Sequence, residues 1–69
     1  MNMVPVTSSN LLSVGYDSQS NRLVIQFRDG TYEYSNVPSN IYQGLLSASS
    51  KGNYHHQHIK NSFPYRKIR

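Results

Sequence analysis

The stretch Arg28-Asp29-Gly30-Thr31-Tyr32-Glu33-Tyr34 decides the fold, because it sets a turn signal at the start of an alternating run. Asp-Gly between two alternating runs is a strong signal for a two-residue β-hairpin. With Asp29 and Gly30 as the loop, Tyr32 and Tyr34 fall on one face of the outgoing strand, since side chains alternate along a strand. The predicted cross-strand pairs are Phe27 with Tyr32 and Ile25 with Tyr34.

A polar cluster, Ser18–Asn21, predicts a second turn that joins this hairpin to an earlier alternating run. Cross-strand partners share a face, so this turn places Tyr16 beside Leu23 and Leu12 beside Phe27. Both turns give the same apolar face, which favours a three-stranded antiparallel meander. The residues predicted on that face are Leu12, Val14, Tyr16, Leu23, Ile25, Phe27, Tyr32 and Tyr34. The opposite face is polar, and Val24 is its lone large apolar residue.

Helical spacing follows the sheet. Pro38 is well placed near a helix start, and the apolar positions from Ile41 to Ala48 recur every three or four residues. Gly44 inside that run predicts a close approach of the helix to the sheet, since glycine otherwise costs about 1 kcal/mol there. A second helix is expected over residues 53–62, ended by Pro64. The predicted class is α+β in the order β-β-β-α-α, with two short helices packed on one sheet face.

The chain of 69 residues has room for a single domain over 1–69, with its core at about 7–65 and flexible segments at 1–6 and 66–69. Burial in so short a chain only narrowly offsets the entropy of ordering it, so a dimer or a larger host is a natural support. Cysteine is absent, and neither a secretory signal nor an apolar run of membrane-spanning length is present. A cytoplasmic protein is expected.

The formal net charge is +4, and its distribution is uneven. All three acidic residues precede Tyr34. After Tyr34 the only charged residues are basic: Lys51, Lys60, Arg66, Lys67 and Arg69. A basic half indicates an anionic partner such as nucleic acid. The alternative is that scattered basic residues only keep a small domain in solution.

Three groups of residues are candidates for chemistry. Tyr32 and Tyr34 have the character of base-stacking aromatics, but their shared face with Phe27 favours a place in the core. A phosphate fits Ser50 and Lys51 at the start of the second helix. Lys60, Arg66 and Lys67 would extend a track for the nucleic-acid backbone, with Tyr54 or Tyr65 interleaved.

The histidines and the acids give little reason to expect catalysis. His55 and His58 are spaced to face one way on a helix, but no cysteine or nearby carboxylate completes a metal site. We expect no metal and no cofactor. No evident pair of acids and no Gly-rich phosphate loop is present, so an enzyme is not expected.

The ordered set of motifs resembles the KTSC domain family. The set runs from Thr7-Ser8-Ser9 through Val14-Gly15-Tyr16-Asp17, Leu23–Phe27, Gly30–Tyr34 and Val37-Pro38 to Leu45–Gly52, Tyr54 and Ile59-Lys60. The resemblance covers about residues 7–65 and implies a small α+β domain of unestablished function, found at the C-terminus of some lysyl-tRNA synthetases and as stand-alone bacterial and phage proteins. The synthetase context implies RNA binding. Family members often have an aromatic residue followed by Asn where this chain has His55-His56.

Together these features predict a non-catalytic module that binds RNA, or nucleic acid broadly, through a basic surface on its helical half. The residues predicted to bind are Lys51, Lys60, Arg66, Lys67, Tyr54 and Ser50, with Tyr32 and Tyr34 at the sheet edge. The alternative is a protein-interaction module, a phage or bacterial adaptor that binds another protein or itself through an apolar patch near Val24, Tyr42 or Tyr54.

Overall fold

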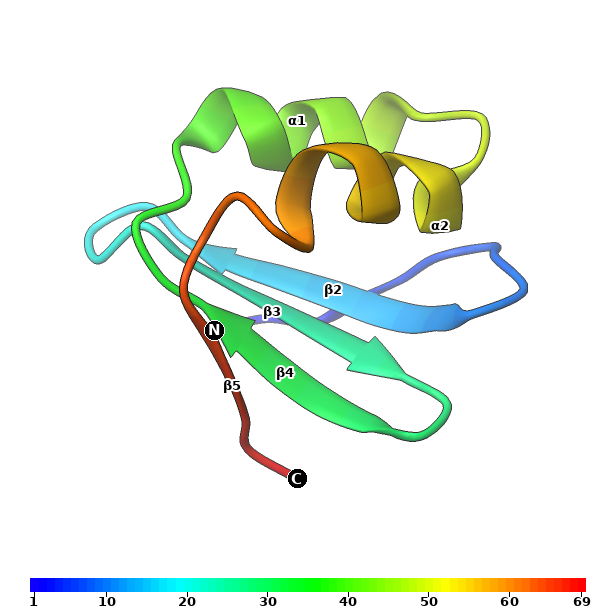
Figure 1. The fold of residues 1–69 in the computed structure, drawn as a ribbon, viewed down its shortest axis with the longest axis horizontal. Helices are drawn as coiled ribbons and strands as arrows, with labels where there is room; N and C mark the ends of the chain where they lie inside the picture. The colour runs from blue at the N-terminus through cyan, green and yellow to red at the C-terminus, as the bar shows by residue number, and fades with distance from the viewer.

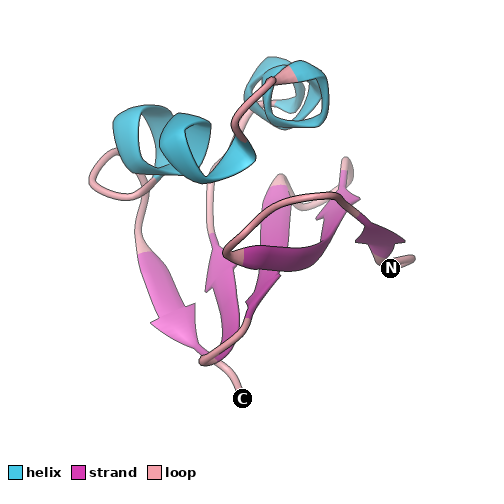
Figure 2. Cartoon of the chain, turned by 90° about the vertical axis from the view of Figure 1, so that its right-hand side faces the viewer, coloured by secondary structure: helices cyan, strands magenta, loops and turns pink.

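The computed structural model of residues 1–69 is a five-stranded antiparallel sheet with its helices on one face (Figure 1). Figure 2 shows the two layers, helices above and strands below. The strands follow one another in chain order across the sheet. They are β1 (Val4–Pro5), β2 (Leu11–Asp17), β3 (Arg22–Phe27), β4 (Gly30–Tyr34) and β5 (Tyr65–Lys67), and the helices are α1 (Ser39–Ser47), α2 (Lys51–Tyr54) and the π-helix η1 (His55–Ile59).

The α+β class and the central meander are confirmed, but the sheet has five strands where three were predicted. Strand β1 pairs with β2 and β5 pairs with β4, each at an edge of the sheet. Both come partly or wholly from segments expected to be flexible. Strands of two or three residues have no alternating pattern and no turn on both sides, so the sequence carries no signal for them. They form because β2 and β4 present unpaired backbone groups, as in the bond from Ile68 N–H to the Thr31 carbonyl (2.8 Å).

The predicted register of the β3–β4 hairpin is wrong by two residues. The loop is Arg28-Asp29, and Phe27 pairs with Gly30 while Ile25 pairs with Tyr32. A loop at Asp29-Gly30 requires φ above zero at both positions. Here Gly30 alone takes a positive φ (155°), just after the two loop residues. A shift of two residues preserves side-chain alternation, so the predicted apolar face survives the error.

A β-bulge between Leu11 and Ser13 overturns the predicted place of Leu12 on the apolar face. Leu11 takes the position opposite Phe27 and is 1% exposed, whereas Leu12 is 37% exposed. The extra residue of a bulge reverses the alternation on one side of it. Two adjacent leucines satisfy either reading, so the sequence could not distinguish them.

The core lies between the sheet and the helices. Ser50 caps α2 by accepting a hydrogen bond from the Asn53 N–H (3.3 Å). The eight core residues are Leu11, Val14, Leu23, Ile25, Tyr34, Val37, Leu45 and Ile59. None of the helices is long and apolar enough to cross a membrane.

Gly44 marks a close approach, but to the other helix and not to the sheet. A Cβ at Gly44 would collide with the hydroxyl end of the Tyr54 side chain, which lies against α1. The hydroxyl donates to the Ile41 carbonyl (3.1 Å). Tyr54 therefore joins α2 to α1, and the glycine makes room for it.

The outer face of the sheet is partly covered by the chain termini. Val24 is only 8% exposed, so it does not form the apolar patch that a protein-interaction role predicted there. Met1 and Met3 lie against Gly15. Val24, Met3 and Ile68 line a shared hollow on this face.

Candidate functional site

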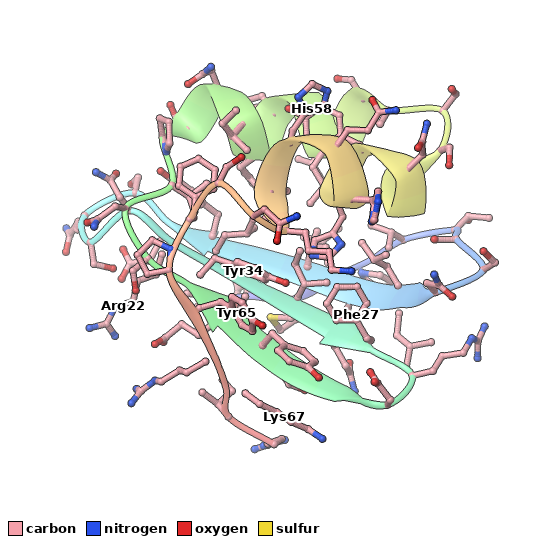
Figure 3. The ribbon with its side chains drawn as sticks, viewed as in Figure 1. Arg22, Phe27, Tyr34, His58, Tyr65 and Lys67 are labelled. Atoms are coloured by element: carbon pink, nitrogen blue, oxygen red, sulfur yellow. The ribbon has the colours of Figure 1, made fainter.

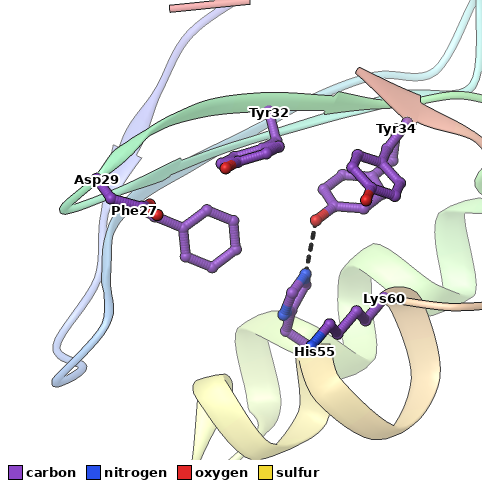
Figure 4. Close-up of a pocket in the computed structure, with 7 residues that line it drawn as sticks. Phe27, Asp29, Tyr32, Tyr34, His55 and Lys60 are labelled. Carbon is purple, nitrogen blue, oxygen red and sulfur yellow. Dashed lines mark hydrogen bonds between the residues drawn. The ribbon is translucent and has the colours of Figure 1, made fainter. Parts of the chain in front are cut away.

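An open pocket of about 280 Å³ lies where the β3–β4 hairpin and β5 meet η1 (Figure 4). The sheet contributes one wall and the π-helix the other. Most of its lining is aromatic, with one acidic and one basic side chain. The lining residues are Phe27, Asp29, Tyr32, Tyr34, His55, Lys60 and Tyr65.

The aromatic rings of the pocket touch one another in a continuous array. Phe27 meets Tyr32 (5.5 Å between centroids) and His55 (4.8 Å) edge to face. The Tyr65 ring is tilted relative to those of Tyr34 (5.6 Å between centroids) and Tyr32 (6.0 Å). Tyr65 lies close to Tyr34 because the two residues pair across β4 and β5 (Figure 3). Tyr65 is 58% exposed, and neither its hydroxyl nor that of Tyr32 has a hydrogen-bond partner in the protein. The array thus keeps ring surface and two hydroxyls available to a ligand.

A hydrogen bond between Tyr34 Oη and His55 Nε2 (2.7 Å) closes the floor of the pocket (Figure 4). Burial lowers the pKa of His55 to about 4, helped by the positive charges of Lys60 and His56. Burial also raises the pKa of Tyr34 to about 12, helped by Tyr65 and Tyr32. Both groups are therefore uncharged at neutral pH, and their polar atoms satisfy each other.

The π-helix explains how His55 and Lys60 come to line the same pocket. In an α-helix, positions five apart point about 140° away from each other. Lys60 N–H instead bonds to the His55 carbonyl (2.9 Å), five residues back. This wider turn brings the two side chains closer to one side of the helix, and such π segments are frequent at functional sites.

Charge in the pocket is divided between Asp29 and Lys60. The other two acidic side chains are already engaged. Glu33 pairs with Arg22 (3.6 Å) and Arg66 (3.2 Å), and Asp17 accepts the Gln19 N–H (3.0 Å). Asp29 has neither an ion pair nor a side-chain hydrogen bond, which leaves its carboxylate available at the pocket wall.

The structure brings together three of the predicted binding residues and places a fourth nearby. Tyr32, Tyr34 and Lys60 line the pocket. Lys67 pairs with Tyr32 across β4 and β5, so both emerge on the same face of the sheet. Its Cε lies 2.5 Å from the position that a Cβ on Gly30 would take.

The remaining four predicted residues lie outside the pocket, and their side chains make contacts within the protein. Lys51 Nζ donates to the Ala48 carbonyl at the end of α1 (3.0 Å), and Ser50 is the α2 cap. Tyr54 is the contact between the helices. Arg66 faces away from the helices and pairs with Glu33 on the outer face. The predicted track across the helical half is therefore not continuous.

The three histidines do not converge. His55 points to Tyr34, while the His58 ring lies on Tyr54 (4.6 Å between centroids) and His56 is exposed. No group of three His, Cys, Asp or Glu side chains is arranged to hold a metal ion.

Phe27, Asp29 and His55 line the pocket but are absent from the predicted binding residues. Phe27 and His55 did carry a signal, because the first shares the apolar face with Tyr32 and the second is four residues before the buried Ile59. Each of these patterns also describes a core residue. Only the meeting of η1 with the hairpin, which no local pattern encodes, shows that the two side chains border an opening.

Comparisons with known proteins agree on one family. A family model for the KTSC domain matches residues 7–63. The crystal structure of a KTSC domain protein from Yersinia pestis has a TM-score of 0.96 at 46% identity and covers 99% of this chain and 97% of its own. An uncharacterized protein from Stutzerimonas stutzeri is 39% identical over 61 residues, which span 87% of this chain and 86% of that protein. A lysine–tRNA ligase from Trichormus variabilis is 39% identical over 54 residues, which span 77% of this chain but 10% of the ligase.

Proposed function

The chain belongs to the KTSC domain family, and we propose that it is a non-catalytic, cytoplasmic module that binds single-stranded RNA. The binding site is the pocket between the hairpin, β5 and η1. One unpaired base enters the aromatic array, and the lysines at its border hold the backbone phosphates.

The observation that carries this proposal is an open aromatic pocket with a lysine in its wall. Single-stranded RNA is recognised chiefly by stacking its splayed bases on aromatic side chains, which contributes about 1–3 kcal/mol per base. A pocket of about 280 Å³ is small for a drug-sized ligand but suits one planar ring. Lys60 in its wall and Lys67 nearby supply the charge that attracts phosphate.

The proposal moves the site away from the surface that the sequence favoured. Lys51 and Tyr54 bond to carbonyls of α1 and its C-cap, and Ser50 caps α2, so these residues offer few free groups to a ligand. Tyr32 combines the two roles that the sequence set against each other. Its ring is partly buried against Phe27, and its exposed remainder borders the pocket.

The similar segment in a lysine–tRNA ligase supports the choice of ligand. That enzyme acts on tRNA, as its name states, and the matching segment occupies a small part of its length. An appended RNA-binding module is consistent with such an arrangement.

The test is a salt titration of binding to a labelled single-stranded RNA of about ten nucleotides, followed by fluorescence anisotropy. If two to four phosphates are neutralised, log K falls against log salt with a slope of roughly −1.4 to −2.8. A flat titration, or no binding at about 50 mM salt, would contradict the proposal.

Lys60→Gln and Lys51→Gln form a matched pair, because each removes one positive charge from the helical layer. Only Lys60 lines the pocket. We expect Lys60→Gln to weaken binding several-fold and to reduce the slope by about 0.7, while Lys51→Gln leaves both nearly unchanged. Equal effects would mean that the charge acts from a distance and that the pocket is not the site.

A second candidate function is protein–protein interaction, including self-association. Apolar side chains remain exposed near the edge strands, among them Met1 (59%), Val4 (43%), Ile68 (42%) and Leu12 (37%). Sedimentation velocity across a range of protein concentrations tests it. A tight dimer that Leu12→Ser disrupts would favour this role, and a monomer at all concentrations would remove self-association.

A further inference from the structure

The pocket contains one carboxylate, and that carboxylate has no partner. Asp29 lies in the two-residue loop of the β3–β4 hairpin and lines the pocket beside Phe27. Figure 4 shows it at the opposite end of the pocket from Lys60. Lys67, whose stem lies against Gly30 next to it, makes no ion pair with it.

The floor of the pocket offers little to distinguish one base from another. Tyr34 Oη and His55 Nε2 are engaged in a hydrogen bond with each other. The other rings give stacking surface, which every base accepts because every base has a π-face. The free hydroxyls of Tyr32 and Tyr65 can each donate or accept, so they do not favour one base edge over another. Asp29 is therefore the group best placed to read the edge of a base.

An ionised carboxylate only accepts hydrogen bonds, and it accepts two side by side. Guanine has two adjacent donors on its Watson–Crick edge, N1–H and the 2-amino group. Adenine places an acceptor, N1, beside its 6-amino group, and uracil flanks its single N3–H with two carbonyls. Cytosine places an acceptor, N3, beside its 4-amino group. Guanine alone matches a lone carboxylate with both oxygens, and only in a single strand is this edge free.

Resting on the proposed RNA-binding function, we infer that the pocket selects guanine, with both Asp29 carboxylate oxygens accepting from N1–H and the 2-amino group. The base stacks among Phe27, Tyr32 and Tyr65, and Lys60 holds a phosphate at the far end. The Asp29 carboxylate and the Lys60 ammonium lie at opposite ends of one aromatic pocket. They match the base edge and the phosphate at the two ends of a guanine nucleotide.

An aromatic pocket with an acid also has the chemistry to hold a cationic side chain through cation–π contacts. Electrostatic repulsion disfavours a cationic occupant, because Lys60 lines the same pocket and the net charge of the chain is +4. A cation entering the pocket would meet one carboxylate, Asp29, and two lysines, Lys60 in the wall and Lys67 nearby. The phosphate of a nucleotide makes use of that excess, so the nucleotide is the occupant we infer.

The test compares four labelled oligouridines that differ only at the central base: uracil, adenine, guanine or inosine. Inosine keeps N1–H but lacks the 2-amino group. We expect the guanine oligomer to bind at least about fivefold more tightly than the adenine one, which is the discrimination typical of a good bidentate contact. The inosine oligomer is expected to fall between them.

Asp29→Asn and Asp17→Asn provide the matched variants, since each removes one negative charge. Asp17 is the last residue of β2 and is not part of the pocket lining, and Asn keeps the oxygen that accepts the Gln19 N–H. Asp17→Asn is expected to bind all four oligomers slightly more tightly, whereas Asp29→Asn should do so only for uracil and adenine and should lose its extra affinity for guanine. Only Asp29→Asn should abolish the preference for guanine. Asp29 makes no side-chain hydrogen bond, so its variant is expected to keep the native circular dichroism spectrum.

The outcomes separate this inference from the function on which it rests. Equal, salt-dependent binding of all four oligomers would overturn guanine selection and leave RNA binding in place. A guanine preference that survives in Asp29→Asn would overturn the role of Asp29. No binding to any oligomer would overturn both, as would a lysine-rich peptide that binds and shifts the pocket resonances where RNA does not.

Discussion

The inner face of the sheet has two halves, and the chain uses tyrosine differently in each. In the first, the aliphatic half, Leu45 of α1 packs in one core cluster with Leu11 and Val14 of β2, all at most 1% exposed. In the second, the aromatic half, η1 meets the hairpin and β5, and the rings of Phe27, Tyr32 and Tyr65 border an opening.

Hydroxyl groups show the difference most directly. Next to the aliphatic half, Tyr16 donates to the Val37 carbonyl (2.6 Å) and Tyr54 to the Ile41 carbonyl (3.1 Å), so both rings are fixed to the backbone. In the aromatic half, the hydroxyls of Tyr32 and Tyr65 have no protein partner. Tyr16 and Tyr54, which bond to carbonyls, hold the fold together, and the hydroxyls of Tyr32 and Tyr65 are available for binding. Each prediction below tests that division.

The largest effect is expected where the aliphatic half is truncated. Leu45→Ala removes a fully buried side chain and leaves a cavity, which costs about 2–5 kcal/mol. That is a large part of the stability of so small a domain. Tyr65→Ala, in the aromatic half, alters a side chain that is 58% exposed and is expected to cost well under half as much.

Denaturant unfolding followed by circular dichroism measures both variants. Leu12→Ala is the control for the leucine, because it makes the same chemical change at a site that is 37% exposed. If Leu45→Ala leaves no folded protein, Ile25→Val provides a milder change at a fully buried position of β3 that pairs with Val14. A cost for Tyr65→Ala equal to that for Leu45→Ala would show that the aromatic half is core as well.

A smaller effect is expected at the junction of the two helices. Gly44→Ala places a Cβ against the Tyr54 hydroxyl, and the ring has to move off its carbonyl partner. Overpacking of this kind costs about 1–3 kcal/mol, which is at least as much as the helix propensity that alanine gains. Gln43→Ala, an exposed neighbour on α1, is the control and is expected to be neutral or slightly stabilising.

A double variant assigns the cause. In a Tyr54→Leu background the clash is absent, so Gly44→Ala should lose most of its cost there. An unchanged cost would mean that the alanine disturbs the sheet beneath α1, as the sequence had suggested, and not the neighbouring helix.

The sequence predicted the features that depend on local pattern. The KTSC resemblance is confirmed, and so are the α+β class, the meander and the apolar face, because a period of two survives a register error of two residues. The bulge at Leu11 escaped prediction because Leu11 and Leu12 are identical in character. The edge strands escaped it because two or three residues carry no periodicity.

The pocket was predictable only in pieces. The residue types and charges predicted Tyr32, Tyr34 and Lys60 as binding residues. That these three line one pocket with Asp29 and His55 depends on a π-turn and on the meeting of segments far apart in the chain. Lys51 and Arg66 show the converse. From the sequence both appear free to bind a ligand. In the structure the first bonds to a carbonyl and the second pairs with a carboxylate.

The smallest effect is expected from the first unit of acidification below about pH 6.5, and it begins in the aromatic half. The pKa of His55 is about 4 in the folded chain and near its ordinary value of 6.5 when unfolded. Between those values the unfolded chain binds more protons, so stability is complete above about pH 6.5 and decreases as the pH falls towards 4. One such group contributes at most about 1.4 kcal/mol per pH unit, and solvent around the partly exposed ring reduces that figure.

Thermal unfolding between pH 7 and pH 4 measures this dependence in the wild type, His55→Gln and His56→Gln. Protonation puts a positive charge on the imidazole of His55, which its burial and the charge of Lys60 both oppose. We expect His55→Gln to flatten the profile and His56→Gln, an exposed control on the next residue, to leave it unchanged. Because the titrating ring forms the pocket floor and not the aliphatic core, tyrosine fluorescence near the pocket should change at a higher pH than the far-ultraviolet circular dichroism. Coincident transitions would mean that the two halves unfold as one unit and that the division between them does not extend to stability.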